Sequence, residues 1–291
     1  MIGRILEITL PIFAIVFAGF VYGRFTKPNM VGANKIIMDL ALPCLVFTSL
    51  SAKKFDFYSH GSFLLGITSI IILSGLLTIP FARFLGTGKK ALLPSVMFVN
   101  VGPIGIPLVV LAFGQDYLGL AILFMVLSNV YHFSIGVSLM SGKFDIKLLA
   151  TNPLILSSVL GILFSFYNFI FPSWLNTSLT MVGSILVPLM LLSLGIRLAE
   201  SKIEYLKVGL LGSIWTFIIR ISVVLVITQF LELDPVQKGT LILFAALPSA
   251  IFNYMIADRF NCEPNKVASI VIVGHILCLI FLPIAILLAL I

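Results

Sequence analysis

The chain has 291 residues, of which 60% are hydrophobic and only 10% are charged, whereas soluble proteins carry about 25% charged residues. This composition excludes a water-soluble enzyme and predicts an all-α polytopic membrane protein whose surface faces lipid. The net charge of +7 comes from 18 lysines and arginines that are scattered through short loops, so a nucleic-acid partner is not expected.

Apolar runs separated by charged residues, prolines, glycines and asparagines predict ten transmembrane helices. In chain order they are expected at residues 5–24, 31–50, 62–84, 91–113, 117–139, 152–171, 177–198, 205–229, 236–257 and 265–290. Ten spans of about 21 residues leave no room for a folded domain outside the membrane. The first run is expected to be a retained span, because no small-residue cleavage site follows it.

The distribution of lysine and arginine predicts the orientation, because short cytoplasmic loops collect these residues. An even number of spans places both termini on one side of the membrane. Most of the basic residues fall in loops on the opposite side, and those on the terminal side are Arg4, Lys53, Lys54 and Lys238. Both termini are therefore expected outside the cytoplasm, with the protein in a plasma membrane or a bacterial inner membrane.

The placement of prolines predicts two five-helix halves. Pro43 and Pro188 fall in the second helix of each half, and Pro103 and Pro248 fall in the fourth. Because five crossings invert the direction of the second half, the expected arrangement is an inverted repeat. The first repeat is 1–141, the cytoplasmic linker is 142–151, and the second repeat is 152–291.

Two of the predicted spans contain helix-breaking segments. The fourth contains Asn100-Val101-Gly102-Pro103-Ile104-Gly105-Ile106-Pro107, and its prolines and glycines cannot sustain an unbroken helix. The ninth contains a milder break, Ala246-Leu247-Pro248-Ser249-Ala250-Ile251-Phe252-Asn253. Unpaired backbone groups inside a membrane must be buried in protein or line a wet cavity, so matched breaks predict a binding site. A pair of ordinary proline kinks is the alternative interpretation.

The same segments carry a family resemblance. Asn100-x4-Gly105-Ile106-Pro107, followed by Ala245-Ala246-Leu247-Pro248 and Arg259-Phe260-Asn261, resembles the auxin efflux carrier family, which includes the plant PIN proteins and bacterial permeases for malate- or malonate-like acids. The resemblance covers nearly the whole chain, although Asn253 stands where the plant proteins tend to have proline. It implies two inverted repeats, a crossover of the fourth and ninth helices in mid-membrane, and elevator-type transport of small organic anions.

We therefore expect a transporter that binds a small mono- or dicarboxylate where the broken helices cross. Its expected substrate-binding residues supply amide groups, backbone N–H groups at half-helix starts, or prolines that leave neighbouring groups unpaired. They are Asn100, Gly102, Pro103, Ile104, Gly105, Pro107, Pro248, Ser249 and Asn253. A sodium-coupled symporter and a cation/proton antiporter of similar architecture remain alternatives, and a non-transporting membrane receptor is an alternative of another class.

Two charged residues within predicted spans are candidates for ion or proton coupling, because a charge at such depth is costly. Asp39 is expected about 12 Å into the second span, either as a coupling site or as a carboxylate that reaches the interface. Arg220, in the eighth span, is expected either to attract an anion or to bond helix-end carbonyls or an acid such as Glu7 or Asp39. His132 and His275 are expected to be hydrogen-bonded packing residues rather than proton relays.

No cofactor or metal site is expected. The three cysteines, Cys44, Cys262 and Cys278, have no CxxC spacing, and the sequence contains no Walker loop, GxSxG, HExxH or paired carboxylates. The expected partners are the organic anion, a coupling proton or sodium ion, the lipid bilayer and, as one open arrangement, a second copy of the chain in a homodimer.

Overall fold

The computed structural model describes residues 2–51, 57–82, 84, 86–144, 147, 150–169 and 171–290. Throughout these ranges the regular structure is helical, apart from a single β-bridge between Val99 and Ser249. Lys53 and Lys54, which enter the expected orientation, lie outside the described residues, as do residues 145, 146, 148 and 149 of the predicted linker.

Seven helices in the described part of the chain are long and apolar enough to cross a membrane. They are Ile2–Thr26, Val31–Ser51, His60–Phe81, Gln115–Ser141, Ser173–Glu200, Leu206–Ile227 and Pro264–Ala289, and they coincide with seven of the predicted spans. The other three predicted spans fall on shorter or interrupted helices. The sixth ends early, because Asn168 takes a left-handed conformation with φ of 50° just after the helix. The chain is thus a polytopic helical membrane protein.

The first part of the chain contains α1 (Ile2–Thr26), α2 (Val31–Ile36), the π-helix η1 (Ile37–Ala41), α3 (Leu42–Ser51), α4 (Phe57–Thr78), η2 (Ile79–Phe81), α5 (Lys89–Met97), the π-helix η3 (Val101–Gly105), α6 (Ile106–Phe113), η4 (Gln115–Tyr117), α7 (Leu118–Tyr131), the π-helix η5 (His132–Gly136) and α8 (Val137–Ser141). The second part contains α10 (Pro153–Phe166), α11 (Ser173–Ser184), α12 (Leu186–Glu200), α13 (Leu206–Ile227), α14 (Pro235–Ala245), α15 (Ile251–Arg259) and α16 (Pro264–Ala289).

Matched prolines distort two of the long helices. Proline has no N–H, and its ring collides with the carbonyl four residues earlier. Pro43 follows the π-helical turn of η1, and Pro188 follows the bend at Ile185 that separates α11 from α12. Both distortions lie in the predicted second helix of a half, so the proline pattern has similar local consequences in the two places.

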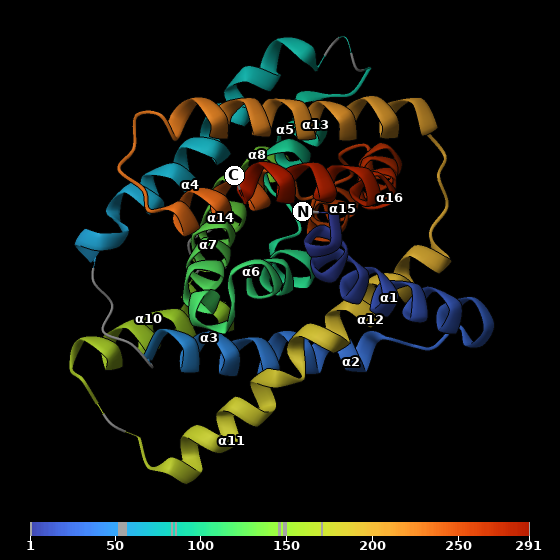
Figure 1. The fold of residues 1–291 in the computed structure, drawn as a ribbon. Helices are drawn as coiled ribbons and strands as arrows, with labels where there is room; N and C mark the ends of the chain where they lie inside the picture. The colour runs from blue at the N-terminus through green and yellow to red at the C-terminus, as the bar shows by residue number, and fades with distance from the viewer. Residues whose placement is uncertain are drawn as a thin grey trace.

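The helices form two groups (Figure 1). The frame group consists of α1, α2, η1, α3, α10, α11 and α12, in which α1 packs along α12, and α3 packs along α10 and α11. The crossover group consists of α4 to α8 with their η segments and α13 to α16, in which α13 packs along α16 and α4. The frame group lies in the lower part of Figure 1 and most of the crossover group lies in the upper part, with α6 between them.

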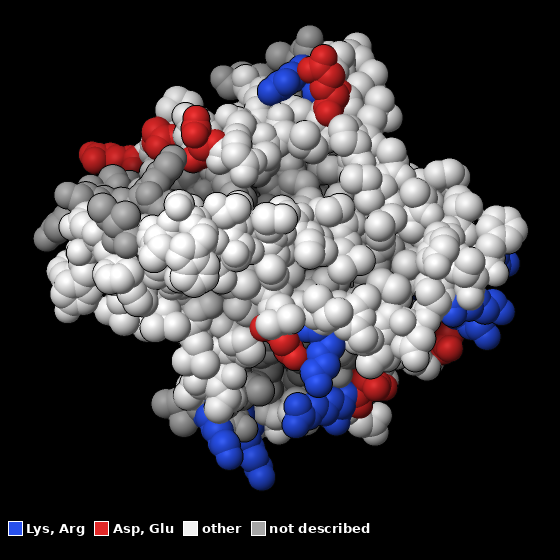
Figure 2. Space-filling model, turned by 90° about the horizontal axis from the view of Figure 1, so that it is seen from below, with Lys and Arg blue, Asp and Glu red and all other residues white. Residues whose placement is uncertain are grey.

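The outer surface is suited to lipid. On the face shown in Figure 2, a broad uncharged surface separates charged side chains that gather at its margins. Large apolar side chains such as Phe17, Phe25, Trp174 and Phe230 are exposed. In water such exposure would be unfavourable, but in a bilayer these side chains contact the hydrocarbon chains of the lipids.

Candidate functional site

The two broken segments cross and bond to each other. The chain leaves helical geometry after Met97 at the end of α5 and after Ala245 at the end of α14. At the crossing the N–H of Asn100 donates to the carbonyl of Pro248 over 2.8 Å, and the N–H of Ala250 donates to the carbonyl of Phe98 over 3.0 Å. These two bonds form an antiparallel bridge, which satisfies backbone groups that would otherwise be unpaired.

The glycines of the first broken segment allow this close approach. A Cβ on Gly105 would collide with the ring of Phe244, which belongs to α14. A Cβ on Gly102 would lie 3.0 Å from the terminal methyl carbon of Met190 on α12, so this residue faces the frame group. The close packing at the crossing therefore requires glycine at position 105. Position 102 lies where the crossing meets the frame group.

The amide of Asn253 holds the crossing from the second segment. Its Nδ2 donates to the carbonyl of Phe98 over 2.8 Å and to the Ser249 hydroxyl over 3.0 Å, and the residue is fully buried. Its Oδ1 has no hydrogen-bond partner, and neither has Nε2 of the nearby His132, which stacks on the ring of Phe98. The side chains of Asn253 and His132 interact with each other, and Nη2 of the nearby Arg220 is a further buried polar atom without a hydrogen-bond partner in the described structure.

The amide of Asn100 is bound by a histidine from α16. Nδ2 of Asn100 lies 2.8 Å from Nε2 of His275, and Nδ1 of the same ring lies 2.7 Å from the carbonyl oxygen of Val271. Both side chains are buried, Asn100 at 6% and His275 at 6% exposure. The interpretation of His275 as a hydrogen-bonded residue agrees with this geometry, but its link to a predicted site residue was not foreseen.

Arg220 bonds the ends of both broken helices. Its guanidinium, which is fully buried, donates to the carbonyls of Met97 over 2.8 Å, Val96 over 3.2 Å and Ala245 over 3.3 Å. These carbonyls belong to the last residues of α5 and α14, where each helix dipole is negative. Of the roles expected for Arg220, the structure shows the bonding of helix-end carbonyls, and it places neither Glu7 nor Asp39 in an ion pair with it.

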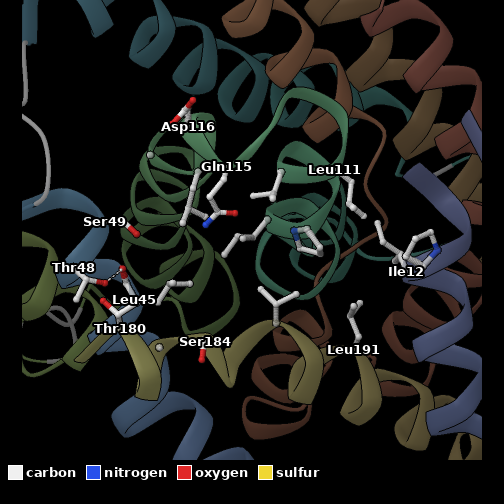
Figure 3. Close-up of a pocket in the computed structure, with 18 of the residues that line it drawn as sticks. Ile12, Leu45, Thr48, Ser49, Leu111, Gln115, Asp116, Thr180, Ser184 and Leu191 are labelled. Carbon is white, nitrogen blue, oxygen red and sulfur yellow. Dashed lines mark hydrogen bonds between the residues drawn. The ribbon is translucent and has the colours of Figure 1, made fainter. Parts of the chain in front are cut away.

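A cavity of about 630 Å³ lies between the two groups on one side of the crossing. Its walls include Ile106 and Pro107 of α6 and Val187 and Leu191 of α12. Figure 3 shows Thr48, Ser49 and Thr180 on one side of this large cavity, Ile12, Leu111 and Leu191 on the other, and Gln115 extending between them. None of the residues that line it is a lysine or an arginine, and its charged residue is Asp116.

A second cavity, of about 390 Å³, lies beyond the crossing. It is formed by the last half of α12, the following segment, α15 and α16, and its lining includes Arg197, Lys202, Tyr254 and His275. The first half of α12 therefore faces the large cavity and the last half faces the second cavity. Pro248 and Ser249 line a separate space of about 10 Å³, about the size of one water molecule.

Most of the predicted site residues lie close together at the crossing, but Asp39 lies elsewhere. Those of the first segment, Asn100, Gly102, Pro103, Ile104, Gly105 and Pro107, run through η3 into α6, and those of the second, Pro248, Ser249 and Asn253, run through the break into α15. Asp39 lies in η1 of the frame group with an exposed side chain, and it lines neither of the two larger cavities. Among the described residues no cluster of three histidines, cysteines or acids could hold a metal ion.

The sequence that forms this crossing matches a known family over nearly its whole length. The family model described as membrane transport protein matches residues 4–147 and 138–286. The chain belongs to this family. That membership confirms the resemblance to the auxin efflux carriers, and it makes the chain a membrane transporter rather than an enzyme.

Individual relatives are distant but cover nearly the whole chain. An uncharacterized transporter of Methanocaldococcus jannaschii is 23% identical over 286 residues, which are 91% of this chain and 92% of the relative. A protein of Rhizobium meliloti named "Putative malonate transporter" is 22% identical over 298 residues, with 94% and 92% covered. An uncharacterized transporter of Methanothermobacter thermautotrophicus is 24% identical over 294 residues, with 95% and 96% covered.

Proposed function

We propose that this transporter is a secondary carrier that binds a small mono- or dicarboxylate at the crossing of the two broken segments. The main observation that supports this proposal is the β-bridge between Val99 and Ser249. It brings two helix interruptions and two asparagines to one place inside an apolar helix bundle, and such interruptions are tolerated in membranes where they line a site. The name of the Rhizobium meliloti relative supports malonate as a first substrate to test.

The proposed site offers hydrogen-bond donors to a carboxylate. The first N–H groups of a helix have no partner within it and carry the positive end of its dipole. In η3 the proposed donors are the N–H groups of Gly102 and Ile104 and, at its last residue, of Gly105. The amide of Asn100 and the N–H of Ser249 complete the set. The amide of Asn253 holds the site in place, because both hydrogens of its Nδ2 bond within the crossing. Pro103, Pro107 and Pro248 prevent the breaks from closing into continuous helices.

We further propose ten spans arranged as two inverted repeats, 1–141 and 152–291, joined by a cytoplasmic linker, 142–151. Two observations support the repeat. Distortions near Pro43 and Pro188 occur in corresponding helices, and breaks after Met97 and Ala245 occur in another corresponding pair. The excess of lysine and arginine in loops opposite the termini supports termini outside the cytoplasm, in a plasma or bacterial inner membrane.

The two cavities support an elevator-type mechanism. Both lie between the frame group and the crossover group, and they face opposite halves of α12. A sliding of the crossover group along α12 would open the crossing to one cavity and then to the other, which is alternating access. An anion that leaves a cell gains about 2.3 kcal/mol per charge for each 100 mV of membrane potential, so export needs no nucleotide.

Counterflow in proteoliposomes tests the proposal. Vesicles that contain the purified protein are loaded with malonate, and entry of labelled malonate is measured. We expect saturable counterflow that falls roughly tenfold or more in Asn100→Ala, because a hydrogen bond to a charged group contributes about 1.5 to 3 kcal/mol. It should also fall in Asn253→Ala, because the amide of Asn253 holds the site in place. Asn29→Ala, at an exposed turn that caps α2, is the matched control and should transport normally.

The same assay separates the alternatives. A panel of malonate, malate, succinate, lactate and acetate that gives no counterflow would contradict carboxylate transport. Binding in a thermal-shift measurement without any flux indicates a receptor. Flux that requires an inward sodium gradient indicates a sodium-coupled symporter, and cation flux that drives proton movement without a carboxylate indicates an antiporter.

A further inference from the structure

His275 connects the crossing to the second cavity. The residue lies in the middle of α16 and is 6% exposed, and it is part of the lining of that cavity. One ring nitrogen meets the carbonyl oxygen of Val271 and the other meets the side-chain amide of Asn100. A titratable group therefore touches a residue of the proposed substrate site and also borders the cavity next to it.

The contact with Val271 fixes the tautomer of the neutral ring. A carbonyl oxygen can only accept a hydrogen bond, so Nδ1 of His275 carries the hydrogen and donates it. Nε2 is then a bare acceptor, and it accepts from Nδ2 of Asn100. Neutral His275 therefore takes one of the two hydrogens of the Asn100 NH₂ group and fixes the orientation of the amide, with Oδ1 on the side away from the ring.

This orientation limits the binding of a carboxylate, which has acceptors only. Asn100 has one N–H hydrogen left for such a ligand, and its Oδ1 is an acceptor that a carboxylate cannot use. A proton on Nε2 of His275 reverses the arrangement, because both ring nitrogens then donate. The amide of Asn100 must rotate by half a turn so that Oδ1 accepts from Nε2, and both hydrogens of Nδ2 can then donate to the substrate.

We propose, on the basis of the proposed carboxylate transport, that His275 is the proton-binding and positioning residue that couples one proton to each bound anion. The proton comes from a hydronium ion of the aqueous phase and reaches the ring through water in the second cavity. One O–H bond of the hydronium breaks as the N–H bond at Nε2 forms, which leaves neutral water, and the only other change is the exchange of hydrogen bonds at Asn100. The added positive charge offsets one negative charge of the carboxylate, so each ligand reduces the cost of burying the other.

The charged surroundings of His275 come from several helices. From α12 and the segment after it, Arg197, Glu200, Lys202 and Glu204 line the same cavity, and from α15 Tyr254 does so. Arg220 of α13 is occupied by the carbonyls of α5 and α14. The charged residues of α5 and α14, Lys89, Lys90 and Lys238, lie in the first turns of those helices, away from the crossing at their other ends. The cavity residues are thus the ones that give protons a route to the ring.

Calorimetry of malonate binding measures the coupled proton directly. Titrations in two buffers with different ionisation enthalpies, above a pH of about 7 where malonate is fully ionised, give the protons taken up per anion. We expect about one proton for the parent protein, and an affinity that falls about tenfold per unit rise in pH. In His275→Gln, whose amide can accept from or donate to Asn100, binding should persist with no proton uptake and no such pH dependence. His60→Gln should behave as the parent does.

Nitrogen NMR of the labelled histidines tests the geometry without any ligand. The chain has three histidines, so the spectra of His60→Gln and His275→Gln assign the signals. We expect the neutral His275 ring to carry its hydrogen on Nδ1. A hydrogen on Nε2, or a His275→Gln protein that still takes up a proton with malonate, would overturn the coupling role. If the parent protein has the expected tautomer but binds no carboxylate, the proposed substrate class is wrong. If the His275 signals do not change during acidification to the limit of the folded state, His275 binds no proton and the proposed proton site is wrong.

Discussion

Arg220 explains how two interrupted helices are tolerated inside an apolar bundle. The ends of α5 and α14 converge with their carbonyls unpaired, and each end carries partial negative charge. One guanidinium supplies hydrogen bonds to both ends. The planar fork of arginine spreads five N–H donors over three nitrogens, so it can reach carbonyls that lie farther apart than the three hydrogens on the single nitrogen of lysine can reach. A charge that looks like a transport residue in the sequence is therefore a part of the framework of the site.

Replacement of Arg220 should lower stability. Arg220→Gln leaves the carbonyls of Met97 and Ala245 without a charged donor, and we expect a loss of about 3 kcal/mol or more in the free energy of unfolding. Arg220→Lys should give an intermediate loss. Denaturant unfolding in detergent measures both variants, and Arg259→Gln, an exposed arginine on α15, is the control. An Arg220→Gln protein that unfolds like the parent but fails to transport would instead assign the guanidinium to the substrate.

At the scale of elements, α1 and α12 are held together through glycines. Gly19 and Gly23 of α1 face Leu192 and Ile196 of α12, and Gly195 of α12 faces the backbone of α1. Added Cβ atoms at Gly19 and Gly195 would lie far inside van der Waals contact with backbone atoms of the partner helix. The close contact of backbones is the typical role of small residues between membrane helices. This pair forms the central part of the frame group.

The substitution Gly195→Ala should therefore separate α1 from α12. We expect a loss of about 1 to 3 kcal/mol, because the backbone of Val16 cannot move aside as a side chain would. Gly32→Ala in α2 is the matched control, since an added Cβ there meets nothing within 4 Å. Alanine favours a helix over glycine by up to about 1 kcal/mol, so the control should be neutral or more stable. Equal thermal stability of the two variants would contradict this packing.

Glu263 joins two loops of the crossover group. Its carboxylate accepts from the N–H of Gly88 over 2.6 Å and from Nζ of Lys266 over 2.6 Å, and Lys266 also donates to the carbonyl of Gly86. Burial alone would raise the pKa of Glu263, but the two hydrogen bonds and the charge of Lys266 outweigh it, so the pKa lies below its ordinary value of 4.5. The contact links the start of α5 to the start of α16.

This shift predicts a pH-dependent effect of Glu263→Gln. A carboxylate whose pKa is lower in the folded state stabilises the fold above its unfolded pKa, and the contribution disappears as the pH falls through the folded pKa. Glu263→Gln should therefore be less stable than the parent at neutral pH, by less than about 1 kcal/mol because the side chain is 36% exposed, and the difference should vanish in acid. Thermal unfolding across this pH range measures it, with exposed Glu232→Gln as the control. A deficit that persists unchanged in acid would rule out the carboxylate as its cause.

At the scale of the whole molecule, the two helix groups contribute differently to the cavities and the crossing. The crossover group carries both broken segments, and the frame group presents α12 to both cavities. Gly102 and Met190 meet where the two groups touch. Relative movement of the two groups must change this contact. The distance between Gly102 and Met190 can therefore be used to test the proposed mechanism.

A reversible cross-link between the groups should stop transport. In a protein without its native cysteines, Gly102→Cys and Met190→Cys are joined by Hg²⁺ or a short bifunctional thiol reagent. We expect counterflow to disappear on cross-linking and to return with a reducing thiol. A pair within the frame group, Asn34→Cys with Ser193→Cys, tests the reagent where no movement is expected, because these side chains are hydrogen-bonded over 2.8 Å between α2 and α12. Full flux in the cross-linked Gly102–Met190 protein would contradict an elevator.

Much of the fold and part of the site could be predicted because the decisive signals are local. Pro103, Pro107 and Pro248 disrupt helices wherever they occur, and apolar length predicts spans independently of their neighbours. The partners of Arg220 and the bond between Asn100 and His275 depend on which helices pack together, over separations of 124 and 175 residues. Gly19 and Gly23 have the GxxxG spacing in the sequence, but their packing against Gly195 follows only from the contact between α1 and α12.

The bridge at the crossing also constrains the order of biosynthesis. The carbonyl of Phe98 accepts from the N–H of Ala250 and from Nδ2 of Asn253, which is 155 residues later in the chain. While the ribosome is still making the second part, the first break has none of these partners. Contacts of such sequence separation form late. The backbone groups of the first broken segment must therefore find other hydrogen-bond partners until residues 246–253 have been made and inserted.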